Sequence, residues 1–366
     1  MNMKRIGVLT GGGDCAGLNA AVKWVVKTAL DQRLEKERGL RFEVIGIRDG
    51  WKGLSFNEDN QSEYTLTLTE ETVRTWDRYG GTNLGTSRYN PYNPKINASQ
   101  KVISNIGKLG LDTLIAIGGD DTLSVAAKLS KQGVNVIGIP KTIDKDLIGT
   151  DYTLGFETAV EVITDIVDKL RTTAGSHRRI FVVETMGRSA GWLALRGGES
   201  AGAYIMLIPE HDFSIERVAD LVLEGRKAGT RYDIILVAEG AKPQSGKVVC
   251  KDENIDSFGH ESLGGIGEYI SNQLNQCLKL ETRSVVLGHI QRGGAPCAYD
   301  RRMGRYYGIA AVNLAIRNEF GKMVSYKDGN FTVIPIEDVI GRLNQVDVDS
   351  MYDTIRYNGT RNILAE

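Results

Sequence analysis

The segment Ile6–Val22 reads IGVLTGGGDCAGLNAAV, and it joins a strand pattern to a helical pattern through three consecutive glycines. Residues 6–10 are mostly apolar on both alternations, which is typical of a parallel strand covered on both faces. Asn19–Leu30 carries apolar residues at i, i+3, i+4, i+7 and i+8 spacing, which indicates an amphipathic helix. A strand, a glycine turn and a helix in this order predict the first unit of an α/β fold.

Further apolar, β-branched runs repeat this pattern along the chain. They are Glu43–Ile47, Thr113–Ile117, Val134–Ile139, Ile180–Glu184, Ala203–Ile208, Asp233–Ala238 and Arg283–Leu287. A second helical pattern spans Gly155–Thr172, so strands and helices alternate. We therefore predict an α/β fold with a mostly parallel, doubly wound sheet. The polar stretches 31–41, 89–100 and 241–258 are predicted to be surface loops or helix ends.

The composition limits the classes of protein to which the chain can belong. Its 366 residues include 43 glycines and 7 prolines, whereas ordinary usage would give about 26 glycines. No Gly-X-Y period exists, which excludes collagen, and 41% hydrophobic residues exclude a disordered linker. Lys and Arg number 45 against 46 Asp and Glu, so the charge does not favour binding to nucleic acid or a membrane surface.

The cysteines and the N-terminal residues bear on the compartment. The four cysteines form no C-x-x-C motif and are predicted to be reduced thiols of a cytosolic protein: Cys15, Cys250, Cys277 and Cys297. Residues 1–10 run directly into a strand pattern without the apolar core of a signal peptide, and no apolar run approaches ~18 residues. We expect a cytoplasmic protein.

The glycine turn after the first predicted strand, Gly11–Gly17, is a candidate phosphate site. Open α/β sheets bind ligands at the carboxyl ends of their strands. Glycines let backbone N–H groups approach phosphate oxygens, and a helix N-terminus adds a partial positive charge. The turn also matches G-x-G-x-x-A, so an NAD(P)-dependent oxidoreductase is an alternative. The acid closing the second strand, Asp49, lies far beyond the ~20-residue spacing of that motif.

Two pairs of carboxylates follow the third and fourth predicted strands. Asp120 and Asp121 stand at a strand end before a helix, where they suit Mg²⁺, although Asp is also an ordinary helix cap. Asp144 and Asp146 alternate with lysines, and in an extended loop they would point the same way. Asp144 would then accept a proton from a substrate hydroxyl while the lysines hold phosphate. The alternative is a solvated charged turn.

Several arginines also lie beside predicted strand ends, and arginine is suited to fork-like contacts with phosphate. They are Arg88, Arg179, Arg188, Arg283 and Arg292. For any one of them, a surface salt bridge is the common alternative. A single histidine such as His289 is more often structural than a ligand, and no His/Cys cluster has zinc spacing.

Seven segments together closely resemble the 6-phosphofructokinase family, in the family's order from residue 5 to about 302. They are IGVLTGGGDCAGLNAAV, GGTNLGTSR, IGGDDT, IPKTIDKDL-GTDYTLGF, VVETMGRSAGWLAL, VAEG and TRSVVLGHIQRGGAP-AYDR. The resemblance implies two doubly wound α/β domains with mostly parallel sheets and an active site in the cleft between them. Residues 1–158 with about 294–340 would bind the phosphoryl donor, residues 159–293 would bind the sugar phosphate, and residues 341–366 would form a C-terminal segment.

The resemblance also implies roles for individual residues. Asp120 would hold Mg²⁺ with Asp146 near the metal, and Asp144 would be the base that deprotonates the sugar 1-hydroxyl. The other residues that would contact the transferring phosphoryl group or the sugar are Gly13, Arg88, Thr142, Ile143, Met186, Gly187 and Arg188. Fructose 6-phosphate would be bound by Glu239, His289 and Arg292. Arg179 and Arg283 would reach the sugar phosphate of a neighbouring subunit, which implies a homo-oligomer, either a tetramer or a dimer.

Two residues bear on the phosphoryl donor. ATP-using members of the family usually have glycine at the positions of Asp121 and Lys141, whereas members that use pyrophosphate resemble this chain. A carboxylate at Asp121 would stand where the α-phosphate of ATP must lie, which would weaken ATP binding by roughly 10²–10⁴. Lys141 would pair with pyrophosphate. The resemblance therefore implies reversible, Mg²⁺-dependent transfer from pyrophosphate to fructose 6-phosphate, in glycolysis or gluconeogenesis.

Other residues depart from the usual pattern of the family. Gly11 replaces a common serine, and Lys145 replaces an asparagine and would add charge for phosphate. Residues 228–231 lack the basic pair that regulated bacterial relatives use, so we expect no control by nucleotides or phosphoenolpyruvate. The alternatives are an ATP-dependent 6-phosphofructokinase, the oxidoreductase and a sugar-phosphate-binding protein without activity.

Overall fold

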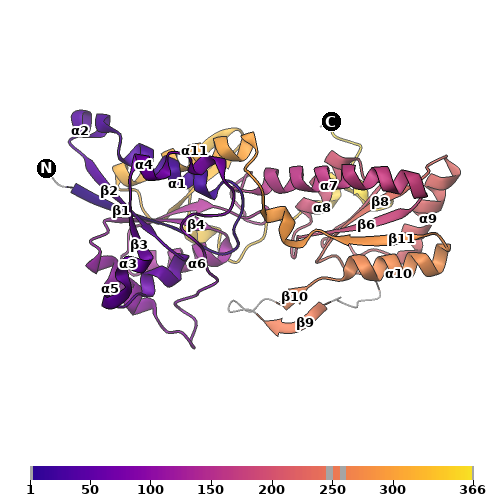
Figure 1. Ribbon diagram of the computed structural model, residues 1–366, viewed down its shortest axis with the longest axis horizontal. Helices are drawn as coiled ribbons and strands as arrows, with labels where there is room; N and C mark the ends of the chain where they lie inside the picture. Colours follow the sequence, from indigo (N-terminus) through magenta and orange to yellow (C-terminus); the bar gives the residue numbers. More distant parts are fainter. Residues whose placement is uncertain (1–2, 245–249, 256–260, 365–366) are drawn as a thin grey trace.

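The computed structural model describes residues 3–244, 250–255 and 261–364, which form two α/β halves arranged along the long axis of the molecule (Figure 1). The larger half contains a seven-stranded sheet of order β13-β12-β5-β4-β1-β2-β3, in which the outer strands β13 and β3 are antiparallel to their neighbours. Its strands are β1 (Met3–Thr10), β2 (Arg41–Ile47), β3 (Thr65–Leu68), β4 (Thr113–Gly118), β5 (Val136–Pro140), β12 (Lys322–Lys327) and β13 (Asn330–Pro335).

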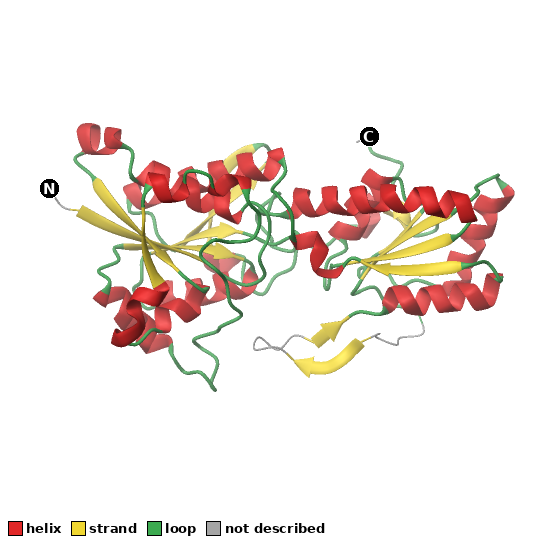
Figure 2. Cartoon of the chain, viewed as in Figure 1, coloured by secondary structure: helices red, strands yellow, loops and turns green. Residues whose placement is uncertain are grey.

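The smaller half contains a parallel four-stranded sheet of order β11-β6-β8-β7. Its strands are β6 (Ile180–Thr185), β7 (Ile205–Leu207), β8 (Asp233–Ala238) and β11 (Thr282–Val286). Helices cover both faces of each sheet (Figure 2). The fold class predicted from the sequence, with two doubly wound α/β units and mostly parallel sheets, is therefore confirmed.

Helices lie on both faces of each sheet, as Figure 1 shows. On the large sheet, α1 (Leu18–Ala29) and α11 (Ala298–Arg317) cover one face, and α5 (Ser99–Lys108) and α6 (Asp120–Lys131) cover the other. On the small sheet the pairs are α7 (Phe156–His177) with α8 (Trp192–Ala201), and α9 (Ile215–Lys227) with α10 (Ile266–Leu278). Within the described ranges, every helix is too short or too polar to span a bilayer.

All eight strands predicted from the sequence are present, because strands covered by helices on both faces are apolar throughout. β4, β6 and β8 are buried at every position. The remaining elements were not predicted, and the polar stretches at 31–41 and 241–258 are partly regular. They include α2 (Gln32–Arg38), α3 (Gln61–Tyr64), α4 (Glu70–Val73), β9 (Cys250–Ile255), β10 (Glu261–Leu263), α12 (Val348–Met351), β14 (Tyr352–Asp353) and β15 (Asn358–Gly359), besides β3, β12 and β13.

The loop prediction for 241–258 is wrong at β9, which pairs with β10 in an antiparallel ladder. Backbone hydrogen bonds between two adjacent strands do not require apolar side chains, so a polar composition did not reveal the pair. Residues 245–249 and 256–258 of the predicted loop lie outside the described residues.

One buried carboxylate, that of Asp300, ties together the two places where the chain passes between the halves. Asp300 lies in the first turn of α11, and its Oδ1 accepts hydrogen bonds from the Tyr152 hydroxyl and the Gly155 N–H, both at 2.6 Å. Its Oδ2 accepts from the Thr158 N–H at 2.9 Å and the Thr158 hydroxyl at 2.6 Å. Because Gly155 and Thr158 begin α7, this carboxylate caps that helix and fixes it against α11.

We predict that Asp300→Ala lowers the free energy of unfolding by about 3 kcal/mol or more, because buried donors without an acceptor cost ~1–3 kcal/mol each. Urea denaturation followed by circular dichroism measures this change. The matched control is Asp165→Ala on the exposed side of α7, which we expect to change stability by less than about 0.5 kcal/mol. Equal losses in the two variants would contradict the role assigned to Asp300.

Candidate functional site

The glycine turn after β1 meets two other loops at the carboxyl edge of the large sheet. The Gly11 N–H donates to the Ile117 carbonyl of β4 at 2.9 Å, and the Gly12 N–H donates to the Ser87 carbonyl at 3.3 Å. The Thr86 hydroxyl donates to the Gly12 carbonyl at 2.6 Å. Three of the predicted segments, 11–17, 80–88 and 117–122, are thus assembled around one turn.

Two of these glycines stand where any larger residue would collide with a neighbouring side chain. A Cβ atom on Gly13 would lie 2.6 Å from Nη1 of Arg292, which donates to the Asp14 carbonyl at 3.0 Å. A Cβ on Gly11 would lie 2.6 Å from the hydroxyl oxygen of buried Thr122. The Gly13 position therefore allows the arginine to lie against the turn, and the Gly11 position is closed to side chains by Thr122.

Lys141 places an ammonium group beneath the same turn. The residue is 3% exposed, and its Nζ donates to the Gly13 carbonyl at 2.5 Å. Its backbone N–H donates to the Gly118 carbonyl at the end of β4, which fixes the start of the loop. Burial lowers the pKa of Lys141, and the nearby Asp146 carboxylate partly opposes that shift. A buried cation so close to the glycine turn can attract an anion bound there.

The Asp144 carboxylate lies near charges of both signs. Its Oδ1 is buried, and among the described residues it has no hydrogen-bond partner. Burial and the adjacent Asp146 raise the pKa of Asp144 to about 6, while Arg292, Arg188 and Lys141 lower it. A carboxylate with an unused oxygen and a raised pKa has the properties of a general base.

The turn that carries Asp144 is not extended, contrary to the sequence prediction. The Asp144 N–H donates to the Thr142 hydroxyl oxygen at 3.1 Å, and Lys145 has a positive φ of 54°. The Lys145 ammonium lies 5.3 Å from the ring centroid of Phe156 and 4.8 Å from that of Trp192. The Lys145 ammonium therefore contacts two aromatic rings, and the expectation that it adds charge for phosphate stays a prediction.

The residues predicted to hold Mg²⁺ are suited to that ion. Asp120 is the first residue of α6, and its Oδ1 accepts from the Gly341 N–H at 2.9 Å. Burial raises the pKa of Asp146, and the Asp120 carboxylate adds to the rise, which indicates that the two are neighbours. No group of three or more His, Cys, Asp or Glu side chains in the described ranges has metal-binding geometry. Two carboxylates are nevertheless a usual protein contribution to Mg²⁺, which keeps waters and binds substrate phosphates.

Asp121 is the second residue of α6, directly after Asp120, and its side chain is half-buried. Its carbonyl accepts a hydrogen bond from the Ser124 hydroxyl at 2.8 Å, which fixes the first turn of the helix. Asp121 thus stands between the metal candidate Asp120 and Thr122, whose hydroxyl faces the glycine turn. Asp121 therefore lies in the first turn of α6, next in the chain to the residue that faces the glycine turn.

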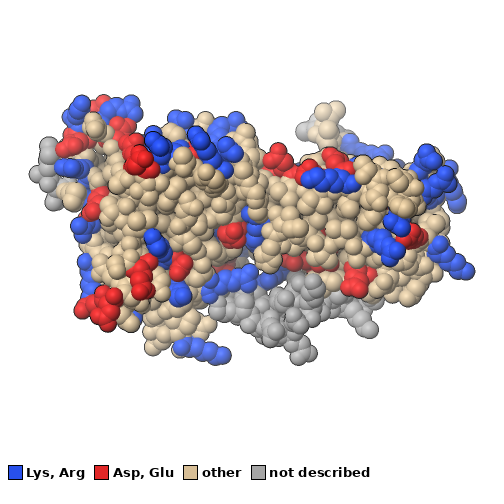
Figure 3. All heavy atoms as spheres, in the orientation of Figure 1, with Lys and Arg blue, Asp and Glu red and all other residues tan. Residues whose placement is uncertain are grey.

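The small sheet contributes a second group of residues. Glu239 follows β8, and burial raises the pKa of Glu239 to about 7. The carboxylate of Asp144 adds to that rise, while the cations Arg188 and Arg292 oppose it. These effects indicate that the carboxylates of Glu239, which follows a strand of the small sheet, and Asp144, which follows a strand of the large sheet, lie near enough to interact electrostatically. Figure 3 shows charged side chains of both signs at the waist between the two halves.

Other predicted residues lie on the loops around this group. The Met186 N–H donates to Oε1 of Gln291 at 3.3 Å, and the Gly187 carbonyl accepts from the Gly240 N–H at 3.1 Å. His289 is exposed on the short helix Gly288–Arg292. Arg88 is exposed at the end of the 80–88 loop, Thr142 is half-buried, and Ile143 is buried beside it.

Arg179 and Arg283 lie elsewhere. Both stand at the amino ends of β6 and β11, opposite the ends that lead to Arg188 and His289. Their side chains meet on Glu281, whose carboxylate oxygens lie 2.7 Å from Nε of Arg179 and from Nη2 of Arg283. Within one chain, the structure does not bring these two arginines to the rest of the site. The prediction that the five arginines gather at one edge of the sheets is therefore only partly correct.

Two contributions to the site were missed from the sequence. Glu184, at the end of β6, is buried and accepts hydrogen bonds from the N–H groups of Gly265 and Gly267, which begin α10. An acid that ends an apolar strand run, with paired glycines later in the chain, is a weak signal for this contact. Residues 341–346, which contact Asp120 and the 144–146 turn, have no distinctive local pattern.

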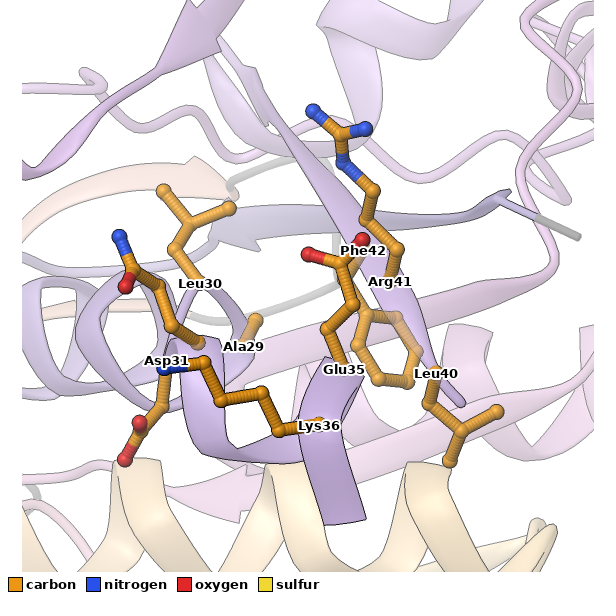
Figure 4. Close-up of a pocket in the computed structure, with 9 residues that line it drawn as sticks. Ala29, Leu30, Asp31, Glu35, Lys36, Leu40, Arg41 and Phe42 are labelled. Carbon is orange, nitrogen blue, oxygen red and sulfur yellow. The ribbon is translucent and has the colours of Figure 1, made fainter. Parts of the chain in front are cut away.

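A hollow of about 690 Å³ lies away from this site, at the C-terminal end of α1 (Figure 4). It is bordered by α2 and the start of β2, and its lining includes Glu35 and Arg41, both labelled in the figure. The glycine turn lies at the opposite end of α1. This hollow therefore has no part in the site described above.

The arrangement of two α/β units around a glycine turn, a buried lysine and paired carboxylates is that of a phosphotransferase. The sequence profile described as "Phosphofructokinase" matches residues 5–315, and the chain belongs to the phosphofructokinase family. This membership leaves the oxidoreductase alternative without support.

Two curated relatives and one solved structure show the range of this similarity. The chain is 43% identical over 352 residues to the pyrophosphate–fructose 6-phosphate 1-phosphotransferase of Streptomyces coelicolor, covering 96% of this chain and 98% of the relative. It is also 43% identical over 350 residues to the ATP-dependent 6-phosphofructokinase of Chloroflexus aurantiacus, covering 94% and 93%. The fold resembles that of the pyrophosphate-dependent phosphofructokinase of Nitrosospira multiformis, with a TM-score of 0.82, 20% identity and coverage of 98% and 89%.

The raised pKa of Glu239 predicts a pH dependence of stability. The folded state holds the proton up to about pH 7, whereas the usual pKa of such a group is 4.5. The stabilisation is therefore complete below about pH 4.5 and is lost as the pH rises through 7, by about 3 kcal/mol in total. We expect the urea-unfolding free energy of Glu239→Gln to fall less between pH 5 and 8 than that of the unmodified protein. The control is Glu216→Gln, an exposed acid; if Glu239→Gln gives a profile parallel to that of the unmodified protein, the prediction is wrong.

Proposed function

We propose that the protein catalyses the reversible, Mg²⁺-dependent transfer of a phosphoryl group from pyrophosphate to the 1-hydroxyl of fructose 6-phosphate. The products are fructose 1,6-bisphosphate and phosphate. The observation that carries this proposal is the burial of the Lys141 ammonium against the glycine turn, together with the presence of Asp121 in the first turn of α6. Lys141 would add a positive charge where phosphate binds on the glycine turn, and Asp121 would add a negative charge beside that phosphate.

Overall similarity does not separate the possible donors. Relatives at the same 43% identity carry names with pyrophosphate and with ATP, so the assignment depends on individual residues. A nucleotide donor needs a third phosphate near the start of α6, where the carboxylate of Asp121 would repel it. Pyrophosphate has no such group, and the Lys141 ammonium compensates its charge. An ATP-dependent 6-phosphofructokinase remains the second candidate, supported by the names of those relatives.

Chemistry at the sugar begins with the Asp144 carboxylate. Its Oδ1, which has no hydrogen-bond partner in the part of the chain that the structure describes, would accept the proton of the sugar 1-hydroxyl. The oxygen of that hydroxyl then bonds to the terminal phosphorus of pyrophosphate as the bridging P–O bond breaks. The leaving group is phosphate, and Lys141 stabilises the charge that develops on it. Arg188 and Arg292, both of which oppose the raised pKa of Asp144, stabilise the charge on the transferring group. Mg²⁺, which Asp120 and Asp146 would hold, supplies neutralisation of the phosphate charges.

The large sheet would form the donor domain, with residues 1–158 and about 294–340, and the small sheet would form the sugar domain, with residues 159–293. We assign the binding of fructose 6-phosphate to Glu239, His289 and Arg292, and the lining of the transfer region to Gly13, Arg88, Thr142, Ile143, Met186 and Gly187. Since Arg179 and Arg283 lie at the far edge of the small sheet, they would serve a second copy of the chain. This requires a homo-oligomer, a dimer or a tetramer.

Asp121→Gly tests the donor assignment. Removing the carboxylate should lower the KM for ATP by roughly 10²-fold, because like-charge contacts cost several kcal/mol, while turnover with pyrophosphate changes much less. Steady-state kinetics with both donors measures this. The control Glu216→Gly removes an acidic side chain from the first turn of another helix, α9, and should leave both KM values unchanged. An unaltered KM for ATP in Asp121→Gly would refute the charge argument.

Asp144→Asn tests the proposed base. The amide keeps the size of the side chain but cannot take a proton, so we expect kcat to fall by about 10²–10⁴, with the KM for fructose 6-phosphate within threefold. Asp151→Asn, an exposed acid that follows the same loop, should retain full turnover. A kcat for Asp144→Asn within threefold of the unmodified enzyme would show that another group removes the proton.

A further inference from the structure

A segment near the C-terminus crosses between the two halves of the molecule directly beside the site. We call residues 341–346 the crossing segment. At one end the Gly341 N–H donates to Oδ1 of Asp120, and at the other the Val346 N–H donates to Oε1 of Glu210, both at 2.9 Å. Between them, the Asn344 N–H donates to the Asp146 carbonyl at 2.8 Å. The crossing segment thus contacts both predicted metal ligands and the small-sheet half.

Asn344 closes a ring of contacts with two residues from different parts of the chain. Its Nδ2 donates to the Lys145 carbonyl at 2.8 Å, and its own carbonyl accepts from the indole Nε1 of Trp192 at 2.9 Å. The Lys145 ammonium lies 4.8 Å from the Trp192 ring centroid, within the range of a cation–π contact. Each member of the ring therefore contacts both of the others.

The ring acts on the one residue that separates the two carboxylates of the catalytic turn. Lys145 has the left-handed backbone conformation, with φ of 54°, which residues other than glycine seldom adopt. That conformation makes the turn between Asp144 and Asp146. The ring holds it from two sides, through the Lys145 carbonyl and through the Lys145 side chain.

We propose that Lys145, Trp192 and Asn344 are positioning residues, which hold the 144–146 turn so that Asp144 faces the sugar and Asp146 faces Asp120. This inference rests on the proposed role of Asp144 but does not depend on which donor is used. Because Trp192 begins α8 of the small half and Lys145 belongs to the large half, the ring also sets the two groups of site residues at a fixed separation. Displacement of a catalytic group by about 1 Å can cost 10²-fold in rate.

Kinetics of variants in the ring test this inference, with whichever donor supports turnover. Lys145→Met keeps the length of the side chain but loses its charge, and Asn344→Asp replaces the Nδ2 donor with an oxygen facing the Lys145 carbonyl. We expect kcat to fall by 10- to 100-fold in each, with the KM for fructose 6-phosphate within threefold. Lys145→Arg restores a cation over Trp192 and should keep kcat within threefold of the unmodified enzyme. Gln345→Ala, whose lost contact is to the Ser189 carbonyl, is the control within the crossing segment.

Thermal unfolding of each variant separates positioning from folding. A merely structural ring would lower the unfolding midpoint while kcat per folded molecule stays within threefold, and that result would overturn the inference. Equal losses of kcat in Lys145→Arg and Lys145→Met would overturn it as well. If the donor assignment fails instead, ATP replaces pyrophosphate in the assay and the same differences among the variants are still expected.

Discussion

The burial of the Lys141 ammonium beneath a glycine turn is the interaction on which the rest of the site depends. A buried charge is costly unless other charges and hydrogen bonds compensate it. Here the Gly13 carbonyl accepts a hydrogen bond from the ammonium, and the carboxylate of Asp146 lies near enough to affect its pKa. The carboxylates of Asp144 and Asp146 repel one another, and the cations Arg188 and Arg292 stabilise the charged form of Asp144. Each charge is tolerated because the others are present, so the site is assembled as one unit.

The topology of the sheets brings these groups together. β1, β4 and β5 are neighbours in the large sheet, so the glycine turn, the start of α6 and Lys141 follow three adjacent carboxyl ends. The chain then enters the small sheet through α7 and returns through α11, and Asp300 joins the two helices. β6 and β8 are adjacent as well, and Arg188 and Glu239 lie on the loops that follow them, near enough to affect the pKa of Asp144 or to be affected by its charge. Two sheets thus contribute to a single site.

The sequence predicted the interior of the fold better than its edges and turns. Strands buried on both faces have a continuous apolar pattern, whereas the outer strands β3, which is partly exposed, and β13, which is largely exposed, lack one. The residues of the site followed from resemblance to a family, since spacing alone left helix caps and charged turns as alternatives. The turn at Lys145 was predicted wrongly because its conformation is set by Asn344, 199 residues later in the chain. Contacts of this kind leave no local pattern.

The central claim is that pyrophosphate, rather than ATP, donates the phosphoryl group, and a competition experiment tests it most directly. The purified protein is given fructose 6-phosphate, Mg²⁺ and equal concentrations of pyrophosphate and ATP, and ³¹P NMR follows both donors over time. The charges of Lys141 and Asp121 predict that the pyrophosphate signal falls as phosphate and fructose 1,6-bisphosphate appear, while the ATP signals remain constant. Consumption of ATP with formation of ADP, while pyrophosphate persists, would contradict the account.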